Sequence, residues 1–286
     1  MIIAFRTDAS SQIGTGHFMR CLTLADELKR KGSKIIFISR HIPQFLAAAL
    51  RDKGFVYKSI KDEIDIDILE DLPHSLWLGT TQENDAKRTN EVLADISCDW
   101  IVVDHYALDH RWEKSVRTSC KKIMVIDDLA DRQHACDVLL DQNYYEDMSS
   151  RYANKVQDHC QLLLGPSYAL LKDDFKSFRT QIVPHSGEVK KILVFFGGID
   201  AADFTSLTIN TLAGINRQWS VDVVIGLQHP NSAKIQKTCE KYRFKCHVQT
   251  ARMAELMSEA DLSIGAGGTA IWERCCLGLP AIVFCT

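Results

Sequence analysis

Residues 2–30 read IIAFRTDASSQIGTGHFMRCLTLADELKR and set the pattern that the rest of the chain repeats. Ile2 to Arg6 is a short apolar run of the kind that forms a buried strand, and a loop containing glycines follows it. Between residues 18 and 30 apolar residues recur with helical spacing, so one face carries Phe18, Leu22, Ala25 and Leu28. A strand, a loop and a helix in this order predict a βαβ unit and a parallel sheet.

The same alternation continues along the chain in two series. In the first series we expect further strands at Lys34 to Ser39, Trp100 to Asp104, Lys122 to Asp127 and Val138 to Asp141. In the second series we expect strands at Lys191 to Phe196, Val221 to Gly226, Cys246 to Gln249, Leu262 to Gly265 and Ala281 to Phe284. Alternating strands and helices predict an α/β fold.

The two series are separated by a segment in which a regular element would be hard to sustain. Residues 165–188 carry Pro166, Pro184 and Gly187, and they are the predicted linker. We therefore expect two Rossmann-like domains, residues 1–180 and residues 187–286. A cleft is expected between them, because ligands bind at the carboxyl ends of the strands in open α/β sheets.

The chain ends directly after a predicted strand. Parallel sheets are normally covered by helices on both faces, and no helix follows this strand. We expect the second domain to be truncated at its C-terminus.

Composition excludes several classes of function. The chain has 286 residues with 34 Lys and Arg against 37 Asp and Glu, so its net charge of -3 gives no basic excess for binding nucleic acid. No secretory signal precedes the first strand, and no apolar run approaches the roughly 18 residues that span a bilayer. We expect a soluble cytoplasmic protein without a membrane partner. Its oligomeric state is left open.

Ten cysteines are scattered along the chain without a CxxC pair. They are interpreted as reduced thiols. Neighbouring residues on a helix point in different directions, so the adjacent Cys275 and Cys276 are interpreted as packing residues and not as a metal or redox site.

The first candidate site is the loop between the first strand and the first helix, with Gly14, Gly16 and His17. Glycines allow a ligand to approach the backbone, and the helix that follows presents free N–H groups and a positive dipole end to an anion. Arg6, Gly14 and Gly16 are therefore assigned to substrate binding. The third glycine of a dinucleotide fingerprint is missing, so NAD is not expected.

His17 lies in the first turn of that helix, where the dipole disfavours an imidazolium and predicts a neutral ring that can act as a general base. Asp8, at the end of the preceding strand, is predicted to orient the ring or to hold the loop. The alternative is that His17 only caps the helix.

Asp104, His105 and Tyr106 follow a second strand and are also expected to face the cleft. Tyr106 could donate to a sugar hydroxyl or an N-acyl carbonyl, whereas Asp104 could fix a loop or a neighbouring ring. His105 could equally be structural.

Two glycine-containing turns in the second domain are further candidates. The first is Gly197 and Gly198, whose small size would keep the floor of the cleft open to a ligand. The alternative is an ordinary strand-to-helix turn with Asp200 as the helix cap. The second turn is a predicted diphosphate cradle, followed one helical turn later by Glu273, which can accept both hydrogen bonds of a ribose diol. Its residues are Gly265, Gly267, Gly268 and Thr269.

Two common cofactor sites are not expected. The cradle lacks the lysine of a P-loop, which argues against a nucleoside-triphosphatase motor. Asp127 and Asp128 are interpreted as a strand-end cap, and neither a metal nor another cofactor is expected.

These motifs together resemble a known family. The segment RTDASSQIGTGHFMRCLTLADEL (residues 6–28) is similar to the amino-terminal signature of the UDP-2,4-diacetamido-2,4,6-trideoxy-β-L-altropyranose hydrolases of pseudaminic acid biosynthesis. The same resemblance extends through WIVVDHYALD (100–109), IDDLADRQHACDVLLDQNY (126–144), LGPSYALLKDDF (164–175), FFGGID (195–200) and GAGGTAIWERCCLGLPAIV (265–283).

The resemblance implies a GT-B fold and an enzyme of nonulosonic acid and surface-glycan biosynthesis. It implies that water attacks the anomeric carbon with inversion and that UDP leaves, with His17 as base, Asp8 and Tyr106 in the catalytic site, and UDP in the second domain. Asn143 matches a family position and is included among the substrate-binding residues. The family's C-terminal Asn-Gln segment is missing from this chain.

Two other functions stay open. A GT-B glycosyltransferase would use the same UDP site and move the amino sugar to an acceptor. A non-catalytic nucleotide-sugar-binding protein would have no use for a base beside the anomeric carbon.

Overall fold

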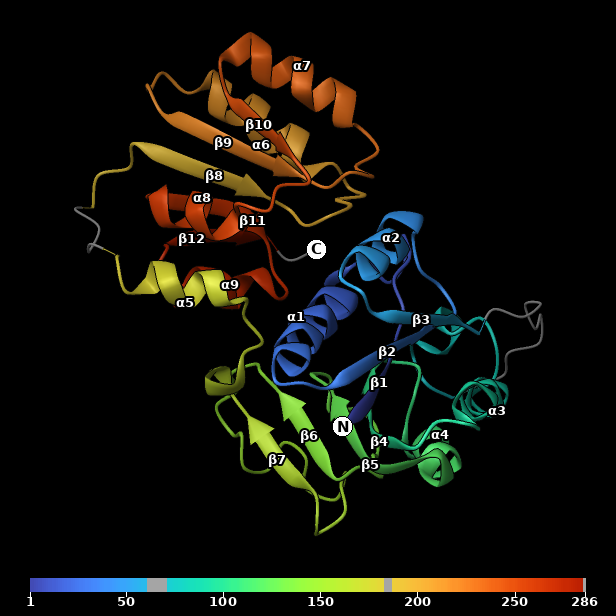
Figure 1. The fold of residues 1–286 in the computed structure, drawn as a ribbon. Coiled ribbons are helices and arrows are strands. Elements are labelled where there is room, and N and C mark those ends of the chain that lie inside the picture. Colours follow the sequence, from blue (N-terminus) through green and yellow to red (C-terminus); the bar gives the residue numbers. More distant parts are fainter. Residues whose placement is uncertain (61–70, 183–186, 285–286) are drawn as a thin grey trace. The chain divides into compact units, whose positions relative to one another are not determined.

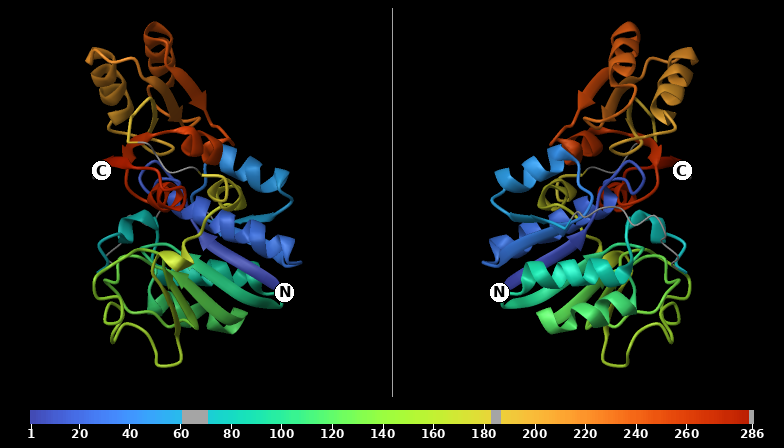
Figure 2. Two further views of the ribbon diagram at one scale, coloured as in Figure 1. Left: turned by 90° about the vertical axis from the view of Figure 1, so that its left-hand side faces the viewer. Right: turned by 90° about the vertical axis from the view of Figure 1, so that its right-hand side faces the viewer.

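The computed structural model describes residues 1–60, 71–182 and 187–284 of the chain. It forms two compact units, Met1–Leu170 and Leu171–Thr286. Each unit has one sheet in which all paired strands are parallel, with helices on both faces (Figures 1 and 2). The predicted α/β fold of two Rossmann-like domains is confirmed. No helix in the described parts of the chain combines the length and the apolar character that crossing a membrane requires.

The sheet of the first unit has the strand order β3-β2-β1-β4-β5-β6-β7. Its strands are β1 (Ile2–Thr7), β2 (Lys34–Ser39), β3 (Val56–Ser59), β4 (Cys98–Asp104), β5 (Cys120–Ile126), β6 (Val138–Asp141) and β7 (Gln161–Leu164). The order runs outward in both directions from the neighbours β1 and β4. This pair is the topological switch point of a doubly wound sheet, where loops diverge and ligands bind.

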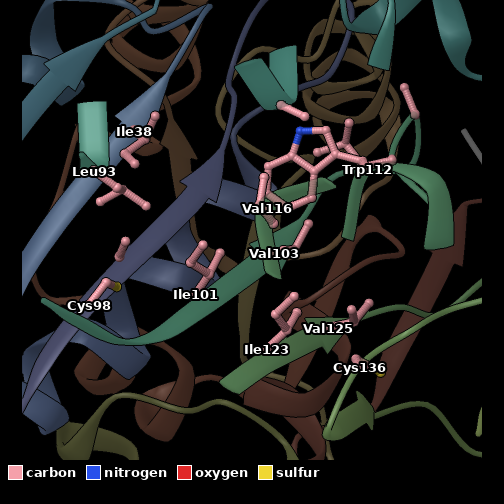
Figure 3. Packing of buried hydrophobic residues seen from close by; sticks show 14 of the residues in the cluster. Ile38, Leu93, Cys98, Ile101, Val103, Trp112, Val116, Ile123, Val125 and Cys136 are labelled. Carbon is pink, nitrogen blue, oxygen red and sulfur yellow. The ribbon is translucent and has the colours of Figure 1, made fainter. Parts of the chain in front are cut away.

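Alternate side chains of the strands cover opposite faces of this sheet. Phe5 and Phe37 belong to the cluster beneath helices α1 (Gly16–Arg30) and α2 (Gln44–Asp52). Ile101 and Val103 belong to the other cluster, beneath α3 (Gln82–Leu93) and α4 (His110–Val116). Figure 3 shows the second cluster, where Trp112 of α4 lies close to Val116 and the side chains of β4. Two apolar layers therefore hold one sheet, as a parallel sheet requires.

The second unit repeats this plan with the strand order β10-β9-β8-β11-β12. Its strands are β8 (Lys191–Phe195), β9 (Ser220–Ile225), β10 (Lys245–Val248), β11 (Leu262–Ala266) and β12 (Ala281–Phe284). Its helices are α5 (Asp173–Arg179), α6 (Phe204–Gly214), α7 (Ser232–Tyr242), α8 (Met253–Glu259) and α9 (Ala270–Cys276). Residues of α6 and α7 pack on one face of the sheet, and residues of α5 and α8 pack on the other. The neighbours β8 and β11 form its switch point.

Every strand predicted from the sequence is present, with ends that differ by no more than two residues. The prediction that residues 165–188 lack regular structure is wrong for α5 and for a short 3-10 helix, η3 (Pro166–Tyr168). Phe175 of α5 is buried in the core of the second unit with Leu193 and Leu256. The structure therefore divides the chain at Leu170, ten residues before the predicted end of the first domain. Part of the predicted linker, residues 183–186, lies outside the described residues, as do Cys285 and Thr286.

The cysteines in the described residues are free thiols, as predicted. The sulfurs of Cys136 and Cys160 lie 3.6 Å apart without a bond. Cys276 packs at the edge of a core cluster, whereas Cys275 is exposed, so the predicted packing role is wrong for Cys275.

A buried ion network anchors α4 to the loop before β6. His134 Nδ1 lies 2.7 Å from Glu113 Oε1, and Nε2 lies 3.8 Å from Asp127 Oδ2. Burial alone would lower the pKa of His134, but Glu113 and Asp127 outweigh this effect and raise it to about 9. His134 is therefore an imidazolium between two carboxylates at neutral pH.

We predict that this network makes the stability of the first unit depend on alkaline pH. A histidine whose pKa is raised in the folded state stabilises it fully below the unfolded value, about 6.5, and this contribution disappears as the pH rises through about 9. The free energy of unfolding should fall by about 3 kcal/mol between pH 6 and pH 10 for this group alone. Urea unfolding of the native chain and of His134→Gln measures it.

His159→Gln changes an exposed histidine of the same unit and serves as the matched control. It should keep the native pH dependence, whereas His134→Gln should lose it. Identical pH curves for the native protein and His134→Gln would contradict the assignment of a charged His134.

Candidate functional site

The loop after β1 presents His17 at the switch point of the first sheet. An isolated bridge joins Ser10 to Gly14, and the hydroxyl of Ser10 accepts hydrogen bonds from the N–H groups of Gln12 and Ile13. Gly14 has φ of 78°, a backbone conformation that side chains disfavour, so a glycine is needed to close this turn. Helix α1 then begins at Gly16, and His17 falls in its first turn, as predicted.

The carboxylate that contacts His17 comes from β4, the strand next to β1. Asp104 Oδ1 lies 2.6 Å from His17 Nδ1. Asp104 is fully buried, and the side chain of His17 is 11% exposed. An ionised carboxylate can only accept a hydrogen bond, so Nδ1 carries the proton and donates it in a hydrogen bond to Asp104. The lone pair of Nε2 then stays available in the neutral ring. This tautomer is the one that a general base using Nε2 requires.

Asp104 stays ionised because two donors share it. Burial opposes ionisation, but Arg20 and His17 outweigh this effect and hold the pKa of Asp104 well below its usual range. Arg20 Nε lies 2.6 Å from Asp104 Oδ2, and Arg20 Nη2 lies 2.7 Å from Oδ1. Arg20 Nη1 also donates to Asp128 at 2.8 Å. The charged groups at this end of the sheet therefore form one connected network.

Aromatic rings form a second layer around His17. The ring centroid of Tyr106 lies 4.4 Å from that of His17 at an angle of 88°, and its hydroxyl donates to Asp128. Trp77 stacks on Tyr106 with centroids 5.7 Å apart, and His74 lies 4.5 Å from Trp77. Trp77 ends a 3-10 helix, η1 (Ser75–Trp77). An apolar wall beside a histidine suits the carbon face of a sugar ring or the methyl of an N-acyl group.

Sequence reasoning missed Trp77 and His74, as well as Arg20. The segment PHSLWLG (residues 73–79) shows neither strand nor helical periodicity, and its available signal was a Trp close to a His in an irregular segment. Arg20 follows His17 by three residues, which places the two side chains on one side of a helix.

Arg6 is not positioned as the sequence predicted, whereas the position of Asp8 fits the second of its two predicted roles, holding the loop. Both are fully buried, and Arg6 binds Asp8 at 2.8 Å and Asp85 at 2.7 Å. Asp8 also accepts from the N–H of Arg40 at 2.8 Å, and His105 Nε2 lies 3.3 Å from it. These partners occupy the carboxylate, whereas Asp104 makes the contact to His17.

The physical reason is that Arg6 and Asp8 balance each other's charge in the interior. Burial raises the pKa of Asp8, but Arg6 and His105 outweigh it and hold that pKa far below its usual range. The assignments of Arg6 to substrate binding and of Asp8 to catalysis are therefore corrected to a role in holding the β1 loop. His105 belongs to the same network, which is the structural alternative that the sequence left open.

Asn143 follows β6, which is separated from β4 by β5 in the sheet order. Its backbone N–H donates to Asp141 at 3.0 Å. Asp127 caps its own turn by accepting from the N–H of Ala130, as predicted for a strand end, whereas Asp128 joins the network around Arg20.

In the second unit the predicted glycine turns follow β8 and β11, the two strands at the switch point. A Cβ added to Gly265 would lie 1.9 Å from the carbonyl oxygen of Phe195, so the neighbouring strands require a glycine there. A Cβ added at Gly267 would meet only Ile271 Cδ1, at 3.8 Å, and one added at Gly268 would meet no described atom within 4 Å. Arg274 donates to the carbonyl of Ala266 at 2.6 Å and holds the start of this loop.

Thr269 and Glu273 follow the glycines as predicted. Thr269 precedes α9, and its hydroxyl makes no cap to that helix. Glu273 lies one turn later and is partly buried. Burial raises the pKa of Glu273 to about 6, although Lys172 and Arg274 act in the opposite direction. Its carboxyl group therefore changes charge within the physiological range.

Gly197 and Gly198 precede a capping cluster. Asp200 accepts from the N–H groups of Phe204 and Thr205, at 3.1 and 2.8 Å. Asp200, Asp203 and His229 are the group with ligand-like spacing in the described residues. Because Asp203 also caps α6 through Ser206, we interpret the cluster as a helix cap, the alternative left open for Asp200.

Comparison with known proteins assigns the fold class. The Glycosyltransferase family 28 C-terminal domain matches residues 192–286. MurG of Acinetobacter baumannii has a TM-score of 0.58 at 13% identity, covering 100% of this chain and 78% of MurG. A variant of Os79 from O. sativa in complex with UDP has a TM-score of 0.61 at 13% identity, covering 100% of this chain and 81% of Os79. The chain thus has the fold of the GT-B glycosyltransferases.

Sequence relatives extend over nearly the whole chain at low identity. An uncharacterised protein of Methanocaldococcus jannaschii is 25% identical over 99% of this chain, which spans only 55% of that relative. The UDP-2,4-diacetamido-2,4,6-trideoxy-beta-L-altropyranose hydrolase of Campylobacter jejuni is 26% identical over 96% of this chain and 87% of its own length. Spore coat polysaccharide biosynthesis protein SpsG of Bacillus subtilis is 25% identical over 99% and 77%.

The geometry predicts the tautomer of His17. In its neutral form the ring should carry its proton on Nδ1, because Asp104 accepts a hydrogen bond there, and Nε2 should be unprotonated. Nitrogen-15 NMR of the imidazole distinguishes the two nitrogens directly. Asp104→Asn should remove the preference, and a neutral ring protonated mainly on Nε2 in the native chain would contradict this geometry.

Proposed function

We propose that this chain hydrolyses a UDP-activated 2,4-diacetamido-2,4,6-trideoxy sugar to UDP and the free sugar. The observation that carries the proposal is the pairing of His17 with buried Asp104 at the switch point of the first sheet. The pair leaves Nε2 free to accept a proton from water. The similarity to the C. jejuni hydrolase supports the substrate, and the complex of the Os79 variant with UDP, which has a similar fold, supports a nucleotide site.

The reaction has a definite proton and electron balance. His17 Nε2 takes one proton from water while the water oxygen bonds to the anomeric carbon. The bond between that carbon and the diphosphate oxygen breaks, and its electron pair leaves with UDP. Attack from the face opposite the leaving group inverts the configuration. General-base assistance of this kind contributes about 100- to 10,000-fold in rate.

The second unit would hold the nucleotide. The open backbone at Gly267 and Gly268 can present N–H groups to a diphosphate, and Glu273 can accept hydrogen bonds from the ribose diol. Backbone donors aimed at the departing diphosphate stabilise the negative charge that develops on it. Tyr106 and Trp77 in the first unit would contact the sugar.

A glycosyltransferase is the competing function, and the match to the Glycosyltransferase family 28 C-terminal domain favours it. A transferase would need an acceptor hydroxyl where the hydrolase admits water. Incubation with the UDP-sugar alone separates the two, because a transferase leaves the substrate intact until an acceptor is present.

We predict that the purified chain releases free UDP and free sugar from the UDP-sugar alone, as followed by proton NMR. His17→Asn should lower the rate at least 100-fold, since an amide cannot accept the proton, while UDP affinity measured by calorimetry changes little. His159→Asn changes an exposed histidine and should keep the native rate. Substrate that stays intact with the native protein would exclude hydrolysis, and a loss of UDP affinity in His17→Asn would reassign His17 to the nucleotide.

We also predict that UDP affinity depends on the charge of Glu273. An ionised carboxylate accepts both ribose hydrogen bonds, so affinity should fall as the pH drops through about 6, by up to about tenfold at pH 5. Glu273→Gln cannot titrate and should lack this component.

Comparing the two proteins at each pH removes the titration of the UDP phosphate, which affects both equally. Glu255→Gln, at a partly exposed glutamate of α8 that pairs with Arg252, is the control and should follow the native curve. Parallel pH curves for the native protein and Glu273→Gln would contradict the ribose assignment.

A further inference from the structure

Arg20 connects His17, the proposed base, with Tyr106, which would contact the sugar in the proposed function. It lies on α1 three residues after His17 and is only 5% exposed. Its guanidinium spans two carboxylates, binding Asp104 through Nε and Nη2 and Asp128 through Nη1. Asp104 in turn contacts the ring of His17, and Asp128 accepts from the hydroxyl of Tyr106. Arg20 therefore holds the carboxylates that position both the His17 ring and Tyr106.

The planar fork of arginine is what this geometry requires. Two nitrogens meet both oxygens of one carboxylate, at 2.6 and 2.7 Å, while the third reaches a second carboxylate at 2.8 Å. A lysine carries the same charge on a single nitrogen and cannot make this set of bonds in one plane. Arg20 thus contributes shape as well as charge.

The charge of Arg20 also acts on His17. The charged and titratable groups that contact the ring are Asp104 at the end of β4, Arg20 on α1 and Tyr106 beyond β4, and His74 packs on Tyr106. Asp104 alone would stabilise an imidazolium. Arg20 Nη2 lies 3.2 Å from His17 Nδ1 and repels that same form. Asp104 and Arg20 therefore act on the charge of the ring in opposite directions.

Arg20 remains a cation throughout. Burial alone would lower its pKa, but Asp104 and Asp128 outweigh this effect and raise it well above the ordinary value. Its repulsion of the imidazolium is therefore present at every pH at which the protein is folded.

We propose that Arg20 is a positioning residue for the hydrolysis: it fixes Asp104 and Asp128, and its charge beside Nδ1 opposes the protonation of the His17 ring. The rate effect rests on the proposed function, whereas the effect on His17 titration does not depend on it.

The test compares the native full chain with Arg20→Met and Arg20→Lys, using two readouts. The first is NMR titration of the His17 ring. The midpoint should move to higher pH by about one unit in Arg20→Met, a tenfold change in proton affinity, because Asp104 is then unopposed. Arg20→Lys keeps the charge and should shift the midpoint by less than half as much.

The second readout is the pH profile of hydrolysis. A base must be neutral to act, so a higher midpoint moves the acid limb of the profile to higher pH. Arg20→Met should lose about tenfold more activity at pH 6 than at pH 9, relative to the native protein. Arg20→Lys should move the limb by less than half as much as Arg20→Met and show a lower plateau, because the fork that holds Asp104 and Asp128 is gone. Arg30→Met, on the exposed last turn of the same helix, is the control and should match the native chain.

Several outcomes would overturn the proposal. An equal loss of activity at all pH values with an unchanged His17 titration in Arg20→Met would leave Arg20 a purely structural role. If Arg20→Met does not fold, Arg20→Lys decides, and native rate and titration in that variant would exclude any need for the fork. If the native chain does not hydrolyse the substrate, the proposed function fails, and the His17 titration in the variants still decides whether Arg20 sets the charge of the ring.

Discussion

A single carboxylate that water does not reach, Asp104, determines how the first unit presents its candidate base. A buried charge is stable only when partners neutralise it and satisfy its oxygens, and here both oxygens are bound by Arg20 and one also by His17. The requirement fixes the rotamers of all three side chains. The tautomer of His17, the place of Tyr106 through Asp128 and the direction of the free Nε2 all follow from it.

The sheet topology makes that contact possible. His17 follows β1 and Asp104 ends β4, which are separated by about ninety residues of sequence yet are adjacent strands at the switch point. The loops that leave these two strands diverge to opposite faces of the sheet, which leaves the strand ends accessible to a ligand. In the second unit, glycine turns likewise follow two adjacent strands at the switch point, β8 and β11. In both units the candidate residues thus lie at the ends of the two strands of the switch point. They are charged side chains in the first unit and mainly glycines in the second.

Sequence patterns predicted the described strands except β3 and β7, as well as the placement of His17, because apolar periodicity and glycine turns are local signals. They failed where the answer depended on packing. The sequence left two roles open for Asp8, orienting His17 or holding the loop, and two for Asp104, fixing a loop or a neighbouring ring. Only the structure shows that Arg6 binds Asp8 in the interior while Asp104 contacts His17. Helix α5 was missed because it is short and lies in a segment with prolines and a glycine, although Phe175 and Phe178 anchor it to the core. Trp77 lies in a segment without periodicity, so its approach to Tyr106 could not be inferred.

The central claim is that His17 and Asp104 direct water to the anomeric carbon of a UDP-sugar, and it is tested most directly by the fate of the water oxygen. Hydrolysis in oxygen-18 water, followed by carbon-13 and phosphorus-31 NMR, locates the label in one product or the other. The account predicts label on the anomeric carbon of the free sugar, inverted configuration in the first-formed product, and unlabelled UDP. Label on a phosphate of UDP, or release of UDP only when a sugar acceptor is added, would contradict it.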